Sequence, residues 1–146
     1  MTWARESRQA WALLFARGVL GFIFFMAGVW KVFTLTPAGH AHKYFMDPYA
    51  DTFLPHWALW AAGLAVPVIE LVAGALMLAG FRVKEASIAL GGVLVLVTFG
   101  HLVKEPLYAF DTHVIPRLAL LLFVMLFPPE ADRFSIDGLL VRRPAN

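Results

Sequence analysis

The sequence predicts an all-α integral membrane protein, an antiparallel bundle of four transmembrane helices in a single domain. Of its 146 residues, 60% are hydrophobic, and the mean hydropathy of +0.72 exceeds what a soluble core needs. Crossing about 30 Å of hydrocarbon takes roughly 20 apolar residues in a helix. Because backbone groups in lipid must be bonded within the element, long apolar runs are expected to be helices.

The spans follow from apolar runs separated by polar or proline-containing connections. The last run ends where Pro128 and Pro129 remove two successive backbone donors. Short connections make sequential helices antiparallel neighbours. We predict spans over about residues 11–33, 57–80, 86–103 and 112–127, an outer loop over residues 34–56 along the membrane surface, and a cytoplasmic tail over residues 128–146.

The distribution of basic residues predicts the orientation of the bundle. With an even number of spans, the amino terminus, the turn between the second and third spans, and the tail share one side. Only Lys43 and Lys104 lie clearly on the opposite side, with Lys31 at its edge. The bias of Lys and Arg places both termini in the cytoplasm. The cations on that side are Arg5, Arg8, Arg82, Lys84, Arg133, Arg142 and Arg143.

Charge and cysteine content exclude several classes of protein. The twelve basic residues are scattered in ones and twos rather than gathered in a tract, which argues against nucleic-acid binding. The chain has no cysteine, so it cannot run thiol–disulfide chemistry by itself or hold an iron–sulfur cluster through thiolates.

Polar and small residues recur at helical spacing along one face of every predicted span. Glycine lets helix backbones approach closely and ionisable groups avoid lipid, so these faces are expected to meet inside the bundle. We call this set the polar seam. Its members are Arg17, Gly21, Phe24, Gly28 and Lys31; Gly63, Pro67, Glu70, Gly74 and Met77; Ser87, Gly91, Leu94, Thr98 and His101; and His113, Arg117, Leu120 and Val124.

Arg17 and Glu70 are the ionisable residues that lie deepest within the first two spans. An ion pair is one of the few ways to keep a carboxylate charged at that depth, so we predict that the two side chains pair. Side chains slant towards the amino end of their own helix, which opposes this pairing in antiparallel neighbours. The pair is interpreted either as a structural link that fixes helix register or as a proton-handling site.

A second polar cluster is predicted at the outer end of the bundle, where Lys31, His101, His113 and Arg117 reach a similar level. A titratable imidazole beside fixed cations suits an apolar ligand whose head gains negative charge on reduction, such as a quinone. In this hypothesis His101 donates to a quinone oxygen, and Arg117 and Lys31 stabilise anionic charge. The alternative is that the cations extend to lipid headgroups and His101 ends a helix.

The outer histidines also raise the question of a metal site. His40, His42 and His56 could supply three imidazole ligands. Their spacing lacks the specificity of a recognised helical metal motif, so interfacial histidines without a metal are the simpler interpretation, and no metal is predicted.

Two stretches of the sequence are rich in glycine: Arg17-Gly18-Val19-Leu20-Gly21 through Lys31, and Pro67-Val68-Ile69-Glu70 through Gly80. The tail contains the segment Asp132-Arg133-Phe134-Ser135-Ile136-Asp137-Gly138. Together these segments resemble the DoxX-like (DoxX/DoxD) membrane proteins. The resemblance implies a four-helix protein of the bacterial inner membrane. Some relatives are subunits of quinone-reducing enzymes, and others are chaperones or receptors.

Two functions remain open from the sequence. The first is a membrane subunit of a quinone-linked oxidoreductase, with quinone as the expected ligand and a partner subunit or small substrate as the electron donor. The second is a non-catalytic scaffold, chaperone or assembly factor whose outer loop docks a partner. Either form would lie in the lipid bilayer, and assembly into an oligomer stays open.

Overall fold

Helices make up the fold. The computed structural model describes residues 2–142, and the side chains from Arg5 onward. Within that range there is no β-strand, so the predicted all-α class is confirmed. In chain order the elements are α1 Thr2–Val29, the π-helical turn η1 Trp30–Thr34, α2 Pro37–Ala41, the π-helical turn η2 His42–Met46, α3 His56–Ala79, α4 Val83–Lys104, α5 Ile115–Met125, the 3₁₀ turn η3 Pro129–Ala131 and α6 Ile136–Val141.

Three helical segments are long and apolar enough to cross a membrane: Arg5–Thr34, His56–Ala79 and Val83–Lys104. The fourth predicted span is not confirmed as a full-length helix, because α5 has only 11 residues. At 1.5 Å per residue it is about 16 Å long, half of the hydrocarbon thickness. The helix begins next to Pro116, a residue that suits a first turn because its missing N–H costs no helical hydrogen bond there.

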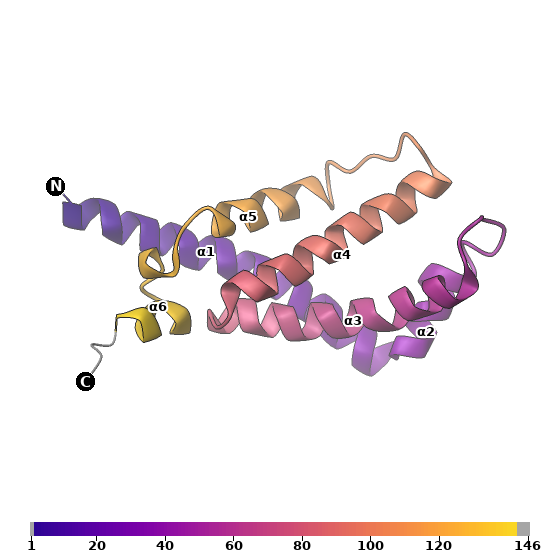
Figure 1. The fold of residues 1–146 in the computed structure, drawn as a ribbon, viewed down its shortest axis with the longest axis horizontal. Coiled ribbons are helices and arrows are strands. Elements are labelled where there is room, and N and C mark those ends of the chain that lie inside the picture. The colour runs from indigo at the N-terminus through magenta and orange to yellow at the C-terminus, as the bar shows by residue number, and fades with distance from the viewer. Residues whose placement is uncertain (1, 143–146) are drawn as a thin grey trace.

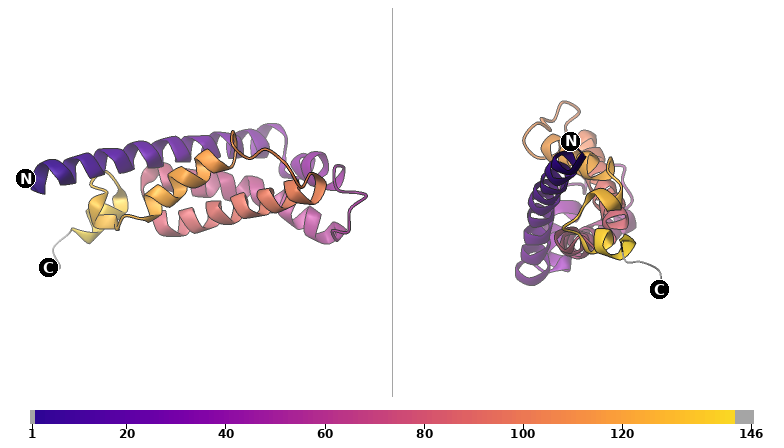
Figure 2. Two further views of the ribbon diagram at one scale, coloured as in Figure 1. Left: turned by 90° about the horizontal axis from the view of Figure 1, so that it is seen from above. Right: turned by 90° about the vertical axis from the view of Figure 1, so that its left-hand side faces the viewer.

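The long helices alternate in direction, and the bundle therefore has two distinct ends (Figures 1 and 2). The terminal end holds the start of α1, the turn between α3 and α4, and α6. The loop end holds α2, η2 and the connection between α4 and α5. From their shared turn, α3 and α4 diverge towards the loop end (Figure 1).

Helices α1 and α3 pack closely because each carries a glycine where it meets the backbone of the other helix. A Cβ atom added at Gly74 would lie 2.5 Å from the backbone nitrogen of Phe25, and one added at Gly28 would overlap the backbone of Leu71. Backbone contact of this kind is the usual role of small residues between membrane helices. Around it lies an apolar core in which Leu20, Met77 and Leu90 are completely buried.

The predicted polar seam faces the interior along most of its length. The seam members in α1 and α3 are buried, and Lys31, in η1, is partly exposed. In α4 Ser87 and Leu94 are buried, whereas His101 is half-buried. The seam is weakest in the fourth segment, where Val124 is buried but His113 is exposed.

The predicted outer loop is folded against α3. The Thr36 Oγ1 caps α2 by accepting a hydrogen bond from the Gly39 N–H at 3.2 Å. Ala41 then packs on Gly63, where an added Cβ would lie 2.5 Å from the Ala41 Cα. The loop therefore covers the loop end of the bundle rather than extending away from it.

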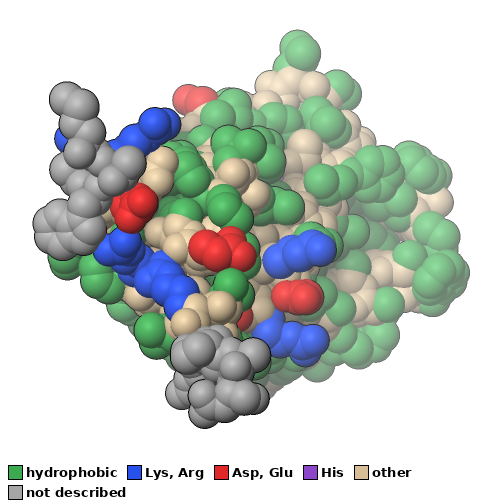
Figure 3. Space-filling view, turned by 60° about the vertical axis from the view of Figure 1, so that its left-hand side comes forward, with side chains coloured by type: hydrophobic (Ala, Val, Ile, Leu, Met, Phe, Trp, Pro, Cys, Tyr) green, Lys and Arg blue, Asp and Glu red, His purple; other side chains and the backbone are tan. Residues whose placement is uncertain are grey.

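The tail is also folded, and it is hydrogen-bonded to the turn between α3 and α4. The Asp137 carboxylate accepts hydrogen bonds from the backbone N–H groups of Arg82 and Val83, at 2.9 and 2.8 Å. Arg143, counted above among the cations, lies outside the described residues. Figure 3 shows basic and acidic side chains gathered at the terminal end and hydrophobic side chains along the flank beyond it.

Candidate functional site

In the described part of the chain two ion pairs lie inside the protein, whereas the sequence predicted one. Arg17 and Glu70 do not pair with each other, so that part of the prediction is wrong. The Arg17 Nε bonds to the Asp132 Oδ2 at 2.9 Å, near the terminal end. The Lys31 Nζ bonds to the Glu70 Oε2 at 2.6 Å, towards the loop end.

The direction of side chains on antiparallel helices explains these partners. Side chains of α1 slant towards its amino end, which is the terminal end, whereas those of α3 slant towards the loop end. Arg17 and Glu70 therefore slant apart. Lys31 lies nearer the loop end than Arg17, and its side chain slants towards the terminal end. The side chains of Lys31 and Glu70 therefore slant towards each other and meet.

Arg17 joins three separate parts of the chain. Its guanidinium also donates to the carbonyl oxygens of Met77 and Leu78, at 2.6 and 2.7 Å, and to that of Phe134 at 3.3 Å. Only 1% of its surface is exposed. The Met77 and Leu78 carbonyls lie in the last turn of α3, where no further helical turn follows to bond them, and the Phe134 carbonyl lies in the tail. Arg17 therefore links α1 to the end of α3 and to the tail.

A cavity of about 630 Å³ lies between α3 and α4 at the loop end. It brings together three members of the predicted outer cluster, Lys31, His101 and His113. Arg117 does not line it, but its positive charge acts on Glu70. The remaining lining residues are His40, Tyr44, Phe45, Tyr49, Leu54, Ala58, Leu59, Ala62, Val66, Leu96, Val97, Phe99 and Gly100.

Sequence analysis missed the contribution of the folded outer loop to this cavity. His40 is buried, and its Nδ1 lies 2.7 Å from the carbonyl oxygen of Gly63. Burial lowers the pKa of His40, and the nearby Lys31 charge lowers it further against the raising effect of the Gly63 hydrogen bond. Burial raises the pKa of Tyr49. Both groups are therefore favoured in their neutral forms.

The three histidines weighed as metal ligands have different surroundings. His40 is bonded to Gly63, the His42 ring packs edge-on against Trp60, and His56 is exposed at the start of α3. Among residues 2–142, no group of three or more His, Cys, Asp or Glu side chains is arranged to hold a metal ion.

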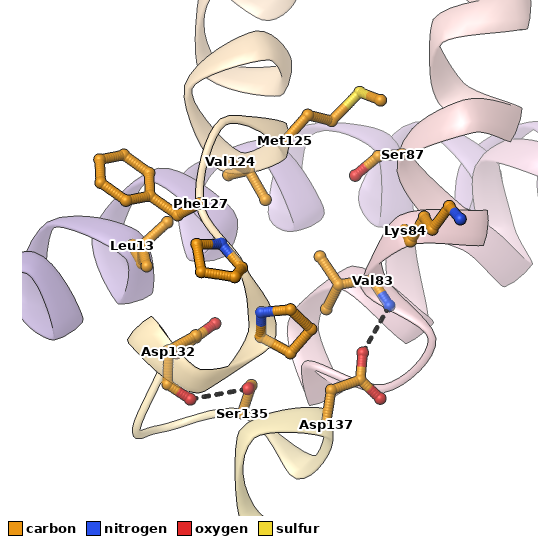
Figure 4. Close-up of a pocket in the computed structure, with 12 residues that line it drawn as sticks. Leu13, Val83, Lys84, Ser87, Val124, Met125, Phe127, Asp132, Ser135 and Asp137 are labelled. Atoms are coloured by element: carbon orange, nitrogen blue, oxygen red, sulfur yellow. Dashed lines mark hydrogen bonds between the residues drawn. The ribbon is translucent and has the colours of Figure 1, made fainter. Parts of the chain in front are cut away.

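A second hollow of about 320 Å³ lies at the terminal end, beside the tail (Figure 4). Its acidic and hydroxyl groups are mostly bonded within the chain: Asp137 to the backbone of Val83, and Ser135 to that of Asp132 (Figure 4). The Ser87 Oγ is completely buried and has no hydrogen-bond partner in the described part of the chain.

Comparison with known proteins identifies the family. The family model described as "Methylamine utilisation protein MauE" matches residues 9–105, which include α2 and most or all of α1, α3 and α4. No curated protein and no solved structure matches the chain. The predicted membership of the DoxX-like family is wrong, because the family model that matches is MauE. The chain therefore belongs to the MauE family, and it is a multi-pass membrane protein.

Proposed function

We propose that the protein is a non-catalytic membrane component of a methylamine utilisation system, and that it holds a partner protein in the membrane. The description of the matching family supports the choice of methylamine utilisation as the system. The geometry supports the role through the fourth segment of the chain, which is helical over only part of its length.

The connection between α4 and α5 carries this proposal. Residues 105–114 are turns and irregular backbone, and most of their side chains are exposed. Leu107 is 93% exposed. If residues 105–125 complete a fourth pass, this irregular stretch enters the membrane, where such backbone is tolerated only when protein or a water-filled cavity covers it. A partner packed beside α4 and α5 would supply that cover.

The internal charges support a structural role in the same protein. Arg17 and Asp132 are paired with each other, and Lys31 and Glu70 are paired with each other. Pairs of this kind fix the register of helices more readily than they carry out a reaction.

The absence of cysteine allows a direct test by site-specific cross-linking. Leu107→Cys and the control Val72→Cys, on the exposed flank of α3, would each carry a photoactivatable maleimide in membranes of methylamine-grown cells. We expect a discrete protein adduct from position 107 and none from position 72. A third probe at Phe53 tests docking through the outer loop. No adduct at 107 or 53 would refute the scaffold role.

The orientation belongs to the same proposal. We place the protein in the bacterial inner membrane with its terminal end in the cytoplasm, because the cations of that end outnumber Lys43 and Lys104 at the loop end. Lys31 does not weigh against this, since it is bonded to Glu70.

A second candidate function is the quinone-linked one, and the loop-end cavity favours it. The cavity has mostly apolar walls and is of a size that accommodates small organic ligands. Lys31 and His101 line it together, as that hypothesis requires. Extraction of the purified protein and analysis for bound quinone tests this candidate. Purified protein without quinone, and no binding of added quinone or quinol, would exclude it.

A further inference from the structure

The hydrogen bonds of two histidines define what the loop-end cavity can recognise. The His40 Nδ1 lies 2.7 Å from the Gly63 carbonyl oxygen, and the His101 Nδ1 lies 2.9 Å from the Val97 carbonyl oxygen. A carbonyl oxygen can only accept, so each Nδ1 must carry the proton. In a neutral imidazole the other nitrogen, Nε2, is then a hydrogen-bond acceptor.

We propose that the loop-end cavity binds a membrane-soluble hydroquinone or phenol, whose hydroxyl groups donate to the Nε2 atoms of His40 and His101. The inference rests on the second candidate function, since it uses the same cavity, and it reverses the hydrogen-bond direction predicted from the sequence. No described residue bonds to either Nε2 atom.

The other walls select for an apolar and uncharged body. Leu54, Ala58, Leu59, Ala62, Val66 and Leu96 line the cavity. Lys31 lines it as well, and its positive charge acts on His40. Methylammonium is also a hydrogen-bond donor, but the Glu70 carboxylate that could balance its charge is already bonded to Lys31.

The oxidised form of the same ligand fits this site less well. A quinone carries only carbonyl acceptors, so it would leave both Nε2 atoms facing an acceptor without a proton between them. Unmade hydrogen bonds of buried groups are costly. We therefore expect the hydroquinone to bind at least about tenfold more tightly than the quinone.

Equilibrium binding to the whole protein in lipid nanodiscs tests this preference, with protein-free nanodiscs as the background. The probes are a decyl-substituted benzoquinone, its hydroquinone under anaerobic reducing conditions, and the dimethyl ether of that hydroquinone. The ether keeps the ring and tail but has no donor. The hydroquinone should bind at least about tenfold more tightly than either of the others.

Variants identify the acceptors. In His101→Asn and His40→Asn an amide N–H can still donate to the backbone carbonyl, but the Nε2 acceptor is lost. Each should weaken hydroquinone binding towards that of the ether, while the exposed His56→Asn control keeps the full preference. If His40→Asn fails to fold, His101→Asn alone decides.

Each other outcome overturns the proposal in a recognisable way. Equal binding of quinone and hydroquinone would leave the quinone candidate standing and remove this inference. No binding of any probe would remove both. Methylammonium displacing the hydroquinone would show that the site takes cationic donors instead.

Discussion

Arg17 shows how a charged side chain becomes tolerable inside a membrane bundle. Its guanidinium reaches one carboxylate and three backbone carbonyls from a position with almost no exposed surface. A charge at such a site is stable only when its donors are paired. A single residue therefore links α1, the end of α3 and the tail.

Arg17→Gln tests that dependence. The substitution leaves the Asp132 carboxylate buried without its cation, so we expect a loss of about 3–5 kcal/mol in the free energy of unfolding. Denaturant titration in mixed micelles measures it. Arg133→Gln is the matched control, because the Arg133–Glu6 pair at 2.7 Å has side chains 36% and 53% exposed. It should cost less than about 1 kcal/mol.

Equal effects of the two substitutions would contradict this account of Arg17.

The inward position of Arg17, Lys31 and Glu70 was predictable, because these residues lie on the same helical face as glycines. Their partners were not. Asp132 lies 115 residues from Arg17, in a tail interpreted as an extension, and periodicity within spans carries no information about it.

Among the elements, α1 and α3 form the closest pair in the bundle, and glycine spacing accounts for it. Gly28 touches the backbone of Leu71, whereas Gly18 on the same helix has no atom near its missing Cβ. The two positions therefore provide a matched comparison within α1.

Gly28→Ala should separate the two helices and cost about 1–3 kcal/mol, because backbone atoms of α3 cannot move aside as a flexible side chain can. Gly18→Ala should be neutral or stabilise the protein by up to about 1 kcal/mol, since alanine favours helix. The same denaturant titration compares them. A destabilised Gly18→Ala with a tolerated Gly28→Ala would mean that α1 and α3 meet through another face.

The spans were predictable to the extent that length and hydropathy define them. Three of the four apolar runs are helices of membrane-spanning length, but α5 has only 11 residues and begins next to Pro116. Helix-packing glycines also explain the mistaken resemblance to the DoxX-like family. Short glycine-rich stretches meet a packing requirement that unrelated membrane helices share, so they report on contact between helices more than on ancestry.

At the scale of the whole molecule, the alternating helices place the turn between α3 and α4 and helix α6 at one end and the histidine-bearing loop at the other (Figure 1). The loop-end cavity therefore lies on the side opposite the basic terminal end. The orientation of the protein in the membrane therefore determines which compartment a ligand or partner at the loop end would face.

The same cysteine-free chain allows that orientation to be measured. Lys43→Cys places a thiol on the loop end, and Lys84→Cys places one beside the turn between α3 and α4; both residues are exposed. Because the terminal end has the greater share of Lys and Arg, a membrane-impermeant maleimide added to spheroplasts should label position 43 and not position 84. Inverted vesicles should give the opposite pattern, and unsubstituted protein sets the background. Labelling of position 84 from outside would reverse the orientation and turn the loop-end cavity towards the cytoplasm.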